Sequence, residues 1–367
     1  MMVRLREPEL SPAVWDAVGA LVDGAASLER LRAHRLHLLA AARLRAAGRP
    51  LPDALALEER RSAINALTVP ALLRRVRTAV DGPVLVLKGP EVASRYPDPV
   101  QRPFGDLDLL VPDAAACLRA LSADGFVAIG DPRLYRGIHH ERPLTLPGLP
   151  VWIELHSSPK WPEGLAPPPT AELLEAAVPS ATGADGISAP DPAQHALILA
   201  AHSWAHDPLR RVGELVDAAA MAEGADLVAL RAQARRWGLH RVWGTTERAA
   251  AALLGRGRAT LPLFTWARHL PAVRERTVFE AHLDRWLSGF WGLPPGPAIA
   301  CARAAAAEAI SPAAGETAAT KRSRMRRAFA NAFVAQSRHA DEIEEAGLRA
   351  PLFYELADRA DGEPRPN

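Results

Sequence analysis

Asp106-Leu107-Asp108-Leu109-Leu110-Val111 is the stretch that decides the fold class of this 367-residue chain. Acidic and apolar residues alternate in it, and alternate side chains of a strand share one face. Asp106 and Asp108 are therefore predicted to project together while the leucines and valine between and after them enter a core. The run Val-Trp-Ile-Glu-Leu-His at 151–156 alternates in the same way and puts Glu154 and His156 on one face. Three carboxylates can thus converge on one spot.

Three carboxylates at the end of a sheet repel one another unless a cation joins them. Oxygen ligands suit Mg²⁺ or Mn²⁺ better than zinc, so the pattern favours a divalent-metal site. Two such ions can clamp the attacking and leaving oxygens of an in-line phosphoryl transfer. The alternative reading is structural: Asp106, after Gly105, is a turn residue, and Asp108 is solvated at a strand end.

The composition fits a globular protein with room for two domains, at 49% hydrophobic and 23% charged residues. A net charge of +2 argues against nucleic acid as the main partner. Cys117 and Cys301 are too few for a disulfide framework. The charged N-terminus and the absence of a long apolar run predict a cytoplasmic protein with no membrane partner.

Hydrophobic periodicity predicts helices before and after a central group of strands. Residues 12–47 and 55–79 have helical spacing and should give two or three helices, and a further helix should run from Pro112-Asp113 to about Gly125. Short branched or alternating runs predict strands, and residues 179–192 are expected to form a loop. The expected strands are 84–87, 106–111, 126–129, 143–146 and 151–155, and the expected late helices are 192–206, 209–222, 226–237, 240–255, 272–288, 299–309, 317–337 and 339–347.

These elements predict an α+β fold in which a small mixed β-sheet core lies between N-terminal helices and a large C-terminal helical domain. The predicted division is 1–80 for the N-terminal helices, 81–160 for the α/β core, 161–191 for a proline-rich linker and loop, 192–360 for the helical domain, and 361–367 for a disordered tail.

Six pieces of the chain, in order, carry a family resemblance. They are Leu87-Lys88-Gly89, Tyr96-Pro97, Arg102, the run 106–111, Gly125-Phe126 and Ile153-Glu154-Leu155-His156. Together they resemble an uncharacterised bacterial nucleotidyltransferase-like family of the polymerase β type nucleotidyltransferase superfamily. The likeness covers roughly residues 60–220, where His195, His202, Arg211 and Asp217 also match a typical run.

The resemblance implies transfer of a nucleoside monophosphate from an NTP to a hydroxyl or phosphate acceptor, with release of pyrophosphate and with Mg²⁺ or Mn²⁺ as cofactor. The acceptor could be a small molecule, a peptide or a protein. Asp106, Asp108 and Glu154 would be the catalytic residues and hold the metals, and Glu154 is also a candidate base.

The same resemblance implies that Lys88 and the Gly89 backbone hold the triphosphate and that Arg102 reaches a phosphate oxygen. His156 would belong to the nucleotide-binding residues, either fixing Glu154 or as a satisfied strand histidine. The superfamily usually has Gly-Ser where this chain has Lys88-Gly89. Purely structural interpretations are also possible for these residues. Gly89 could serve a tight turn, Lys88 could be solvated, and Arg102 could form an ion pair with Asp106 or Asp108.

Two other functions remain open from the sequence. The first is a catalytically silent nucleotide-binding or regulatory module of the same fold, which the replacement of Gly-Ser supports and the three carboxylates oppose. The second is a metal-dependent phosphohydrolase using His202, His206 and Asp207, because His202 and His206 lie four residues apart on one helix face.

Overall fold

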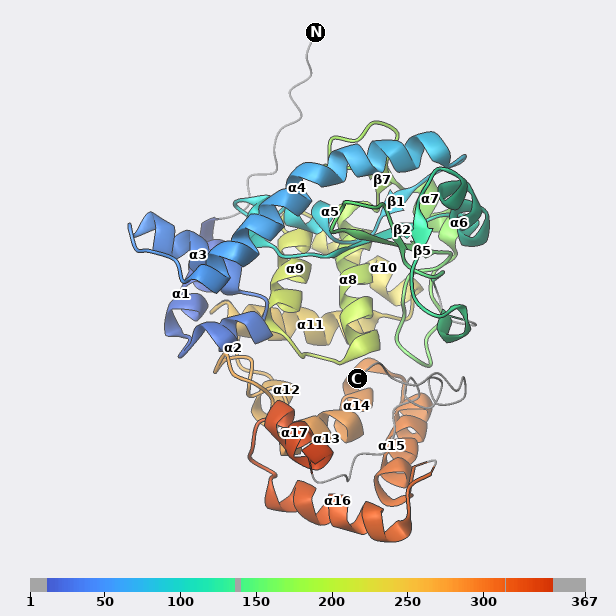
Figure 1. Ribbon diagram of the computed structural model, residues 1–367. Helices are drawn as coiled ribbons and strands as arrows, with labels where there is room; N and C mark the ends of the chain where they lie inside the picture. The colour runs from blue at the N-terminus through green and yellow to red at the C-terminus, as the bar shows by residue number, and fades with distance from the viewer. Residues whose placement is uncertain (1–11, 136–139, 314, 346–367) are drawn as a thin grey trace, which may run out of the picture. The chain divides into compact units, whose positions relative to one another are not determined.

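The computed structural model describes residues 12–135, 140–313 and 315–345 (Figure 1). The chain divides into two compact units. Unit 1 comprises Met1–Leu263 with Leu270–Arg274, and unit 2 comprises Phe264–His269 with Glu275–Asn367. The predicted tail, 361–367, lies outside the described residues.

Four helices precede the first strand, rather than the expected two or three: α1 (Pro12–Gly24), α2 (Leu28–Ala33), α3 (His37–Ala46) and α4 (Asp53–Ala79). The run 12–47, which has helical spacing, is broken twice. Ser27 caps the start of α2 by accepting a hydrogen bond from the Arg30 amide. Arg35 then adopts a φ of +59°, which ends α2 and redirects the chain into α3.

Seven strands form one mixed sheet in the order β3-β4-β5-β2-β1-β7-β6. The α+β fold class is therefore confirmed. The sheet is larger than predicted, because two strands lie in the segment expected to be linker and loop, and β7 pairs in parallel with β1. The strands are β1 (Leu85–Val86), β2 (Asp106–Leu110), β3 (Val127–Ala128), β4 (Leu144–Thr145), β5 (Trp152–His156), β6 (Val178–Pro179) and β7 (Ser188–Ala189).

Short helices connect the strands of unit 1. Asp113 caps α6 by accepting from the Ala116 amide, as the Pro112-Asp113 start signal predicts. The connecting elements are α5 (Pro90–Ala93), η1 (Pro99–Gln101), α6 (Ala114–Ala123), η2 (Pro132–Tyr135) and α7 (Thr170–Glu175).

The central strands β2 and β5 run parallel and set the register of the site. Asp108 pairs with Glu154, and Leu107 pairs with Ile153. Paired residues of neighbouring strands point to the same face, so the acidic residues share one face and the apolar residues share the other. The apolar face packs against α4 and α6 in a core that includes Leu107, Leu109, Ile153 and Leu155, all fully buried.

Helix α8 (Pro192–His206) is joined to the sheet at β1. The ring Nε2 of His195 donates to the carbonyl oxygen of Leu87 at 2.5 Å, and both groups are buried. Helices α9 (Val212–Ala222), α10 (Leu227–Arg236) and α11 (His240–Leu253) also belong to unit 1. Residues 192–263 thus lie in the same compact unit as the sheet.

The buried His195 should make the stability of the protein depend on pH. Burial lowers its pKa to about 4, although the hydrogen bond to Leu87 acts in the opposite direction. As the pH falls below about 6.5, the unfolded chain binds a proton that the folded chain does not bind until about pH 4, so the free energy of unfolding decreases by roughly 3 kcal/mol across that window.

Urea unfolding of the wild type and of a His195→Gln variant, at pH 7 and at pH 4.5, measures this contribution. The variant should lose less stability on acidification than the wild type does. Equal losses in the two proteins would contradict a neutral, buried His195.

Unit 2 is helical in its described part. Its helices are α13 (Val278–Leu287), α14 (Gly289–Gly292), α15 (Pro295–Ile310), α16 (Ala318–Ala330) and α17 (Gln336–Glu345), while α12 (Leu261–Thr265) spans the boundary between the units. A capping box of Thr277 and Glu280 starts α13 six residues later than the periodicity predicts. None of the helices in the described part of the chain has the length and apolar content that a membrane crossing requires.

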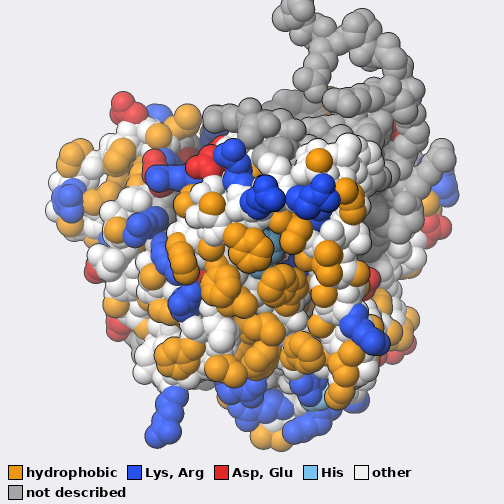
Figure 2. Space-filling view, turned by 90° about the horizontal axis from the view of Figure 1, so that it is seen from below, with side chains coloured by type: hydrophobic (Ala, Val, Ile, Leu, Met, Phe, Trp, Pro, Cys, Tyr) orange, Lys and Arg blue, Asp and Glu red, His pale blue; other side chains and the backbone are white. Residues whose placement is uncertain are grey.

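Several large apolar side chains of unit 2 are exposed, among them Phe329 at 77% and Phe333 at 80%. Figure 2 shows hydrophobic side chains gathered on the face viewed there, with Lys and Arg side chains beside them.

Candidate active site

Three side chains from β2 and β5 come together on the polar face of the sheet. Asp108, Glu154 and His156 each offer one ligand atom, and these atoms lie within 4.8 Å of one another. Asp108 and His156 are each only 2% exposed, whereas Glu154 is half-buried. The group therefore combines two carboxylates and an imidazole in a place with limited access to water.

Asp106 begins β2 and lies on the same face as Asp108, two residues earlier. It is half-buried and stands outside the group of three. Its charge nevertheless contributes to the raised pKa of Glu154. The structure therefore brings Asp108 and Glu154 directly together, and His156 lies in the same group. Asp106 is a neighbour of this group rather than a member of it.

The two carboxylates of this group have opposite pKa shifts. Burial raises the pKa of Glu154, and the negative charge of Asp108 raises it further. Burial would also raise the pKa of Asp108, but the nearby Lys88 ammonium and the hydrogen bond from His156 lower it overall. Lys88 Nζ lies 3.1 Å from Asp108 Oδ2, and His156 Nε2 lies 3.0 Å from Asp108 Oδ1. Asp108 is thus held ionised, while Glu154 binds a proton more readily than an ordinary glutamate.

Lys88 and Gly89 form the turn between β1 and α5. Gly89 has a φ of +63°, and a Cβ placed there would stand 3.0 Å from the carbonyl oxygen of Asp106. Only glycine fits such a conformation and such a close approach without strain. The turn therefore places the Lys88 ammonium against Asp108 and brings the backbone of β1 close to the start of β2.

A Gly89→Ala substitution tests this close approach. Gly82 has a comparable positive φ of +85° with open space around it, so a Gly82→Ala variant isolates the backbone strain. Both variants should be destabilised by roughly 1–3 kcal/mol from strain, and Gly89→Ala should lose more because of the contact with Asp106. Chemical unfolding of both variants measures the difference, and equal losses would contradict a packing role for Gly89.

Arg102 is buried and bound to α9 of the same unit. Its Nε donates to Asp217 Oδ1 at 2.9 Å, and its NH2 group donates to Asp217 Oδ2 at 2.8 Å. Its NH1 group donates to the Gly89 carbonyl at 3.1 Å, and the Tyr96 hydroxyl donates to Asp217 at 2.7 Å. The carboxylate partner of Arg102 is thus Asp217 rather than Asp106 or Asp108, and the network supports the turn at Gly89.

Two lysine–histidine pairs adjoin the carboxylates. Lys88 Nζ donates to His202 Nε2 at 2.8 Å, and Lys160 Nζ lies 3.0 Å from both ring nitrogens of His206. The two histidine rings are 4.6 Å apart between centroids. Burial, followed by the charge of Lys160, lowers the pKa of His206 to about 4, and burial followed by Lys88 lowers the pKa of His202 well below its usual value. Both imidazoles are therefore neutral at pH 7.

The sequence predicted no role for Lys160, and it did not predict that Asp217 is the partner of Arg102. Asp217 falls within the run of His, His, Arg and Asp that carries the resemblance, so that run was the available signal for it. Lys160 stands four residues after His156, between the last of the six pieces and the run that begins at His195. The rarity of lysine could have drawn attention to Lys160, because only three of the 44 Lys and Arg residues in the chain are lysines.

Comparison with known proteins bears on the same part of the chain. Neither the curated proteins nor the solved structures contain a match to this sequence. The model of a protein family described as uncharacterised nucleotidyltransferases does match, over residues 22–255. That range lies within unit 1 and includes β2, β5, the Lys88-Gly89 turn and α8. Since the match covers well over half of the sequence, the chain belongs to this family of uncharacterised nucleotidyltransferases.

Proposed function

We propose that this protein is a divalent-metal-dependent nucleotidyltransferase that moves a nucleoside monophosphate from an NTP to a hydroxyl or phosphate acceptor and releases pyrophosphate. The acceptor would be a small molecule, a peptide or a protein. The observation that carries the proposal is the pairing of Asp108 with Glu154 on parallel strands, beside the Lys88 ammonium. The mixed sheet and the strand-to-helix turn at Lys88-Gly89 also support a place in the polymerase β type superfamily.

The residues of the site fit a divalent cation. Asp108 and Glu154 supply carboxylate oxygens at short range, and Asp106 supplies a further carboxylate from the same face. Carboxylate oxygens are the ligands that Mg²⁺ and Mn²⁺ prefer in proteins. Bound divalent ions neutralise the charge that develops on phosphate oxygens in phosphoryl transfer. His156 would add a nitrogen ligand, or would hold Asp108 in place through its Nε2.

The protein's own groups would share the remaining tasks. Glu154, with its raised pKa, is suited to accept the proton of the acceptor hydroxyl. Lys88 would bind a phosphate as a point charge, in place of the hydroxyl of the usual Gly-Ser. Arg102 would act indirectly, by fixing the Gly89 carbonyl and hence the position of Lys88.

The other two functions have less support. A silent module would have no use for a cluster of carboxylates, which costs stability unless a cation compensates it. A hydrolase centre at His202, His206 and Asp207 would place a metal cation against the ammonium groups of Lys88 and Lys160. Asp207 also lies 3.7 Å from the side chain of Arg210, so a positive group faces it as well.

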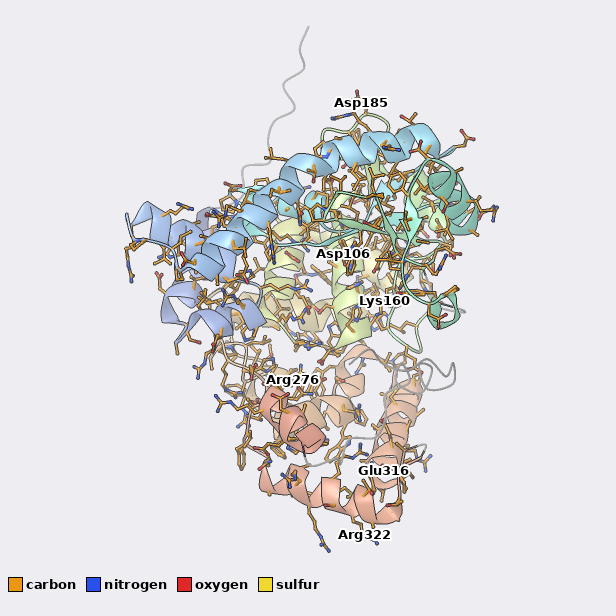
Figure 3. The ribbon with its side chains drawn as sticks, viewed as in Figure 1. Asp106, Lys160, Asp185, Arg276, Glu316 and Arg322 are labelled. Carbon is orange, nitrogen blue, oxygen red and sulfur yellow. The ribbon has the colours of Figure 1, made fainter. Side chains whose placement is uncertain are left out.

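Calorimetric titration with each of the four NTPs, in Mg²⁺ and in EDTA, tests the proposal. The wild type should bind at least one NTP more tightly in Mg²⁺, and an Asp106→Asn, Asp108→Asn double variant should lose at least about 100-fold in affinity, or about 2.8 kcal/mol. Asp185→Asn is the matched control, because Asp185 is an exposed acidic residue that Figure 3 shows well away from Asp106. If the NTP affinities are the same with and without Mg²⁺, and the same in the wild type and the double variant, the proposal is overturned.

A further inference from the structure

Lysine is rare in this chain, and two of its lysines lie at the candidate site. Lys88, Lys160 and Lys321 are the only lysines among 44 basic Lys and Arg residues. Lys321, in unit 2, donates from its buried side chain to the carbonyl oxygen of Glu308 at 2.9 Å and so has a structural contact. The other two stand beside Asp108 and His206. A compact ammonium group is thus used at this site where the chain otherwise uses guanidinium.

Lys160 reaches the site from the segment that follows β5. Its Nζ contacts the ring of His206 at the end of α8, and the charges of Lys88, Glu154 and Asp108 all act on it. A continuous series of contacts runs from Asp108 through Lys88, His202 and His206 to Lys160. Figure 3 shows Lys160 and Asp106 on the same side of unit 1, away from Asp185.

Among the residues that the structure describes, no carboxylate lies at ion-pair distance from the Lys160 ammonium. Its close partner is the neutral imidazole of His206, whereas Lys88 has the carboxylate of Asp108 at 3.1 Å. Burial and the nearby Lys88 lower the pKa of Lys160, which means that the site holds this ammonium at a cost. An anion bound between the two lysines would remove that cost.

We propose that Lys160 and His206 form, together with Lys88, a binding site for a polyphosphate anion. Lys88 would bind one phosphate and Lys160 the next, so that the protein recognises its donor by the β- and γ-phosphates and holds pyrophosphate after transfer. An ammonium group suits this task because it binds phosphate as a point charge without the fixed fork geometry of arginine. This inference rests on the proposed function and extends it to residues outside the sheet.

Titration with inorganic tripolyphosphate in EDTA tests the anion site without the metal. The wild type should bind tripolyphosphate, and Lys160→Met should weaken that binding about 10-fold or more, as expected for loss of a charge-assisted contact. Lys160→Arg should retain part of the affinity. Arg210→Met is the matched control: it removes a positive charge from an exposed residue four positions after His206 and should change the affinity less than about 2-fold. Circular dichroism and thermal unfolding establish that each variant is folded.

A second titration separates phosphate recognition from nucleoside recognition. In Mg²⁺, Lys160→Met should weaken binding of the preferred NTP and leave binding of the corresponding NMP unchanged. Wild-type affinity for tripolyphosphate in Lys160→Met, or equal losses for NTP and NMP, would overturn the inference while Mg²⁺-dependent NTP binding still supports the transferase. A third outcome is also informative: Lys160→Met loses tripolyphosphate binding, but Mg²⁺ does not affect NTP binding by the wild type. This result would support the anion site and overturn the transferase proposal.

Discussion

Replacing Asp217 by alanine should lower the free energy of unfolding by about 3–5 kcal/mol, which is the usual cost of removing one partner of a buried ion pair. Asp217 accepts two hydrogen bonds from Arg102 and one from Tyr96, and all three side chains are buried. Alanine would leave the Arg102 guanidinium charged, buried and without its carboxylate. Urea unfolding of the variant, followed by circular dichroism, measures the loss.

Two milder variants separate the contributions within this network. Tyr96→Phe removes only the hydroxyl and should cost about 1–2 kcal/mol, while Asp217→Asn removes the charge but keeps one acceptor oxygen and should fall between the two. Since Arg102 also holds the Gly89 carbonyl, the folded fraction of Asp217→Asn should bind NTP more weakly. A loss below about 1 kcal/mol in Asp217→Ala would mean that the ion pair contributes little.

Replacing Glu154 by glutamine should reduce nucleotidyl transfer by roughly 10²–10⁴-fold, the range associated with loss of a positioned general base. The substitution keeps the shape of the side chain but removes both the proton acceptor and a metal-binding charge. It also removes the repulsion between Glu154 and Asp108 that helps to raise the pKa of Glu154, so the folded state should be no less stable than the wild type. Mg²⁺-dependent release of pyrophosphate from the preferred NTP, with water as the acceptor of the NMP group, reports the first effect, and thermal unfolding reports the second.

Glu175→Gln provides the matched control for this experiment, because Glu175 is exposed at the end of α7. Its rate of pyrophosphate release should equal that of the wild type. If Glu154→Gln retains the wild-type rate in the same assay, Glu154 is neither the base nor a metal ligand.

The carboxylates could be predicted from the sequence because strand alternation has a period of two. That alternation correctly placed Leu107 and Leu109 in the core and the acidic residues on the opposite face. The register that pairs Asp108 with Glu154 could not be predicted, since it depends on how β2 and β5 meet in the sheet. The contacts of Asp217 and Lys160 could not be predicted for the same reason: their partners lie on elements distant in the sequence.

Local sequence patterns were also insufficient to predict the shortest elements. The strands β6 and β7 each have two residues, and only pairing with β1 makes their segment part of the sheet. Helical periodicity found the helices after residue 192 but could not show that α8 packs with the sheet, because compact units are defined by long-range contacts. The break at Arg35 depends on a backbone conformation that no residue-type preference indicates.

We propose above that Asp108 and Glu154 hold a divalent cation together with the donor nucleotide. Electron paramagnetic resonance of Mn²⁺, titrated into the protein with a non-hydrolysable analogue of the preferred NTP, measures this directly. The wild type should remove free Mn²⁺ from solution, and it should do so more strongly with the analogue present, whereas an Asp108→Asn, Glu154→Gln variant should not. Equal Mn²⁺ binding by the wild type and this variant would contradict a cation site at Asp108 and Glu154.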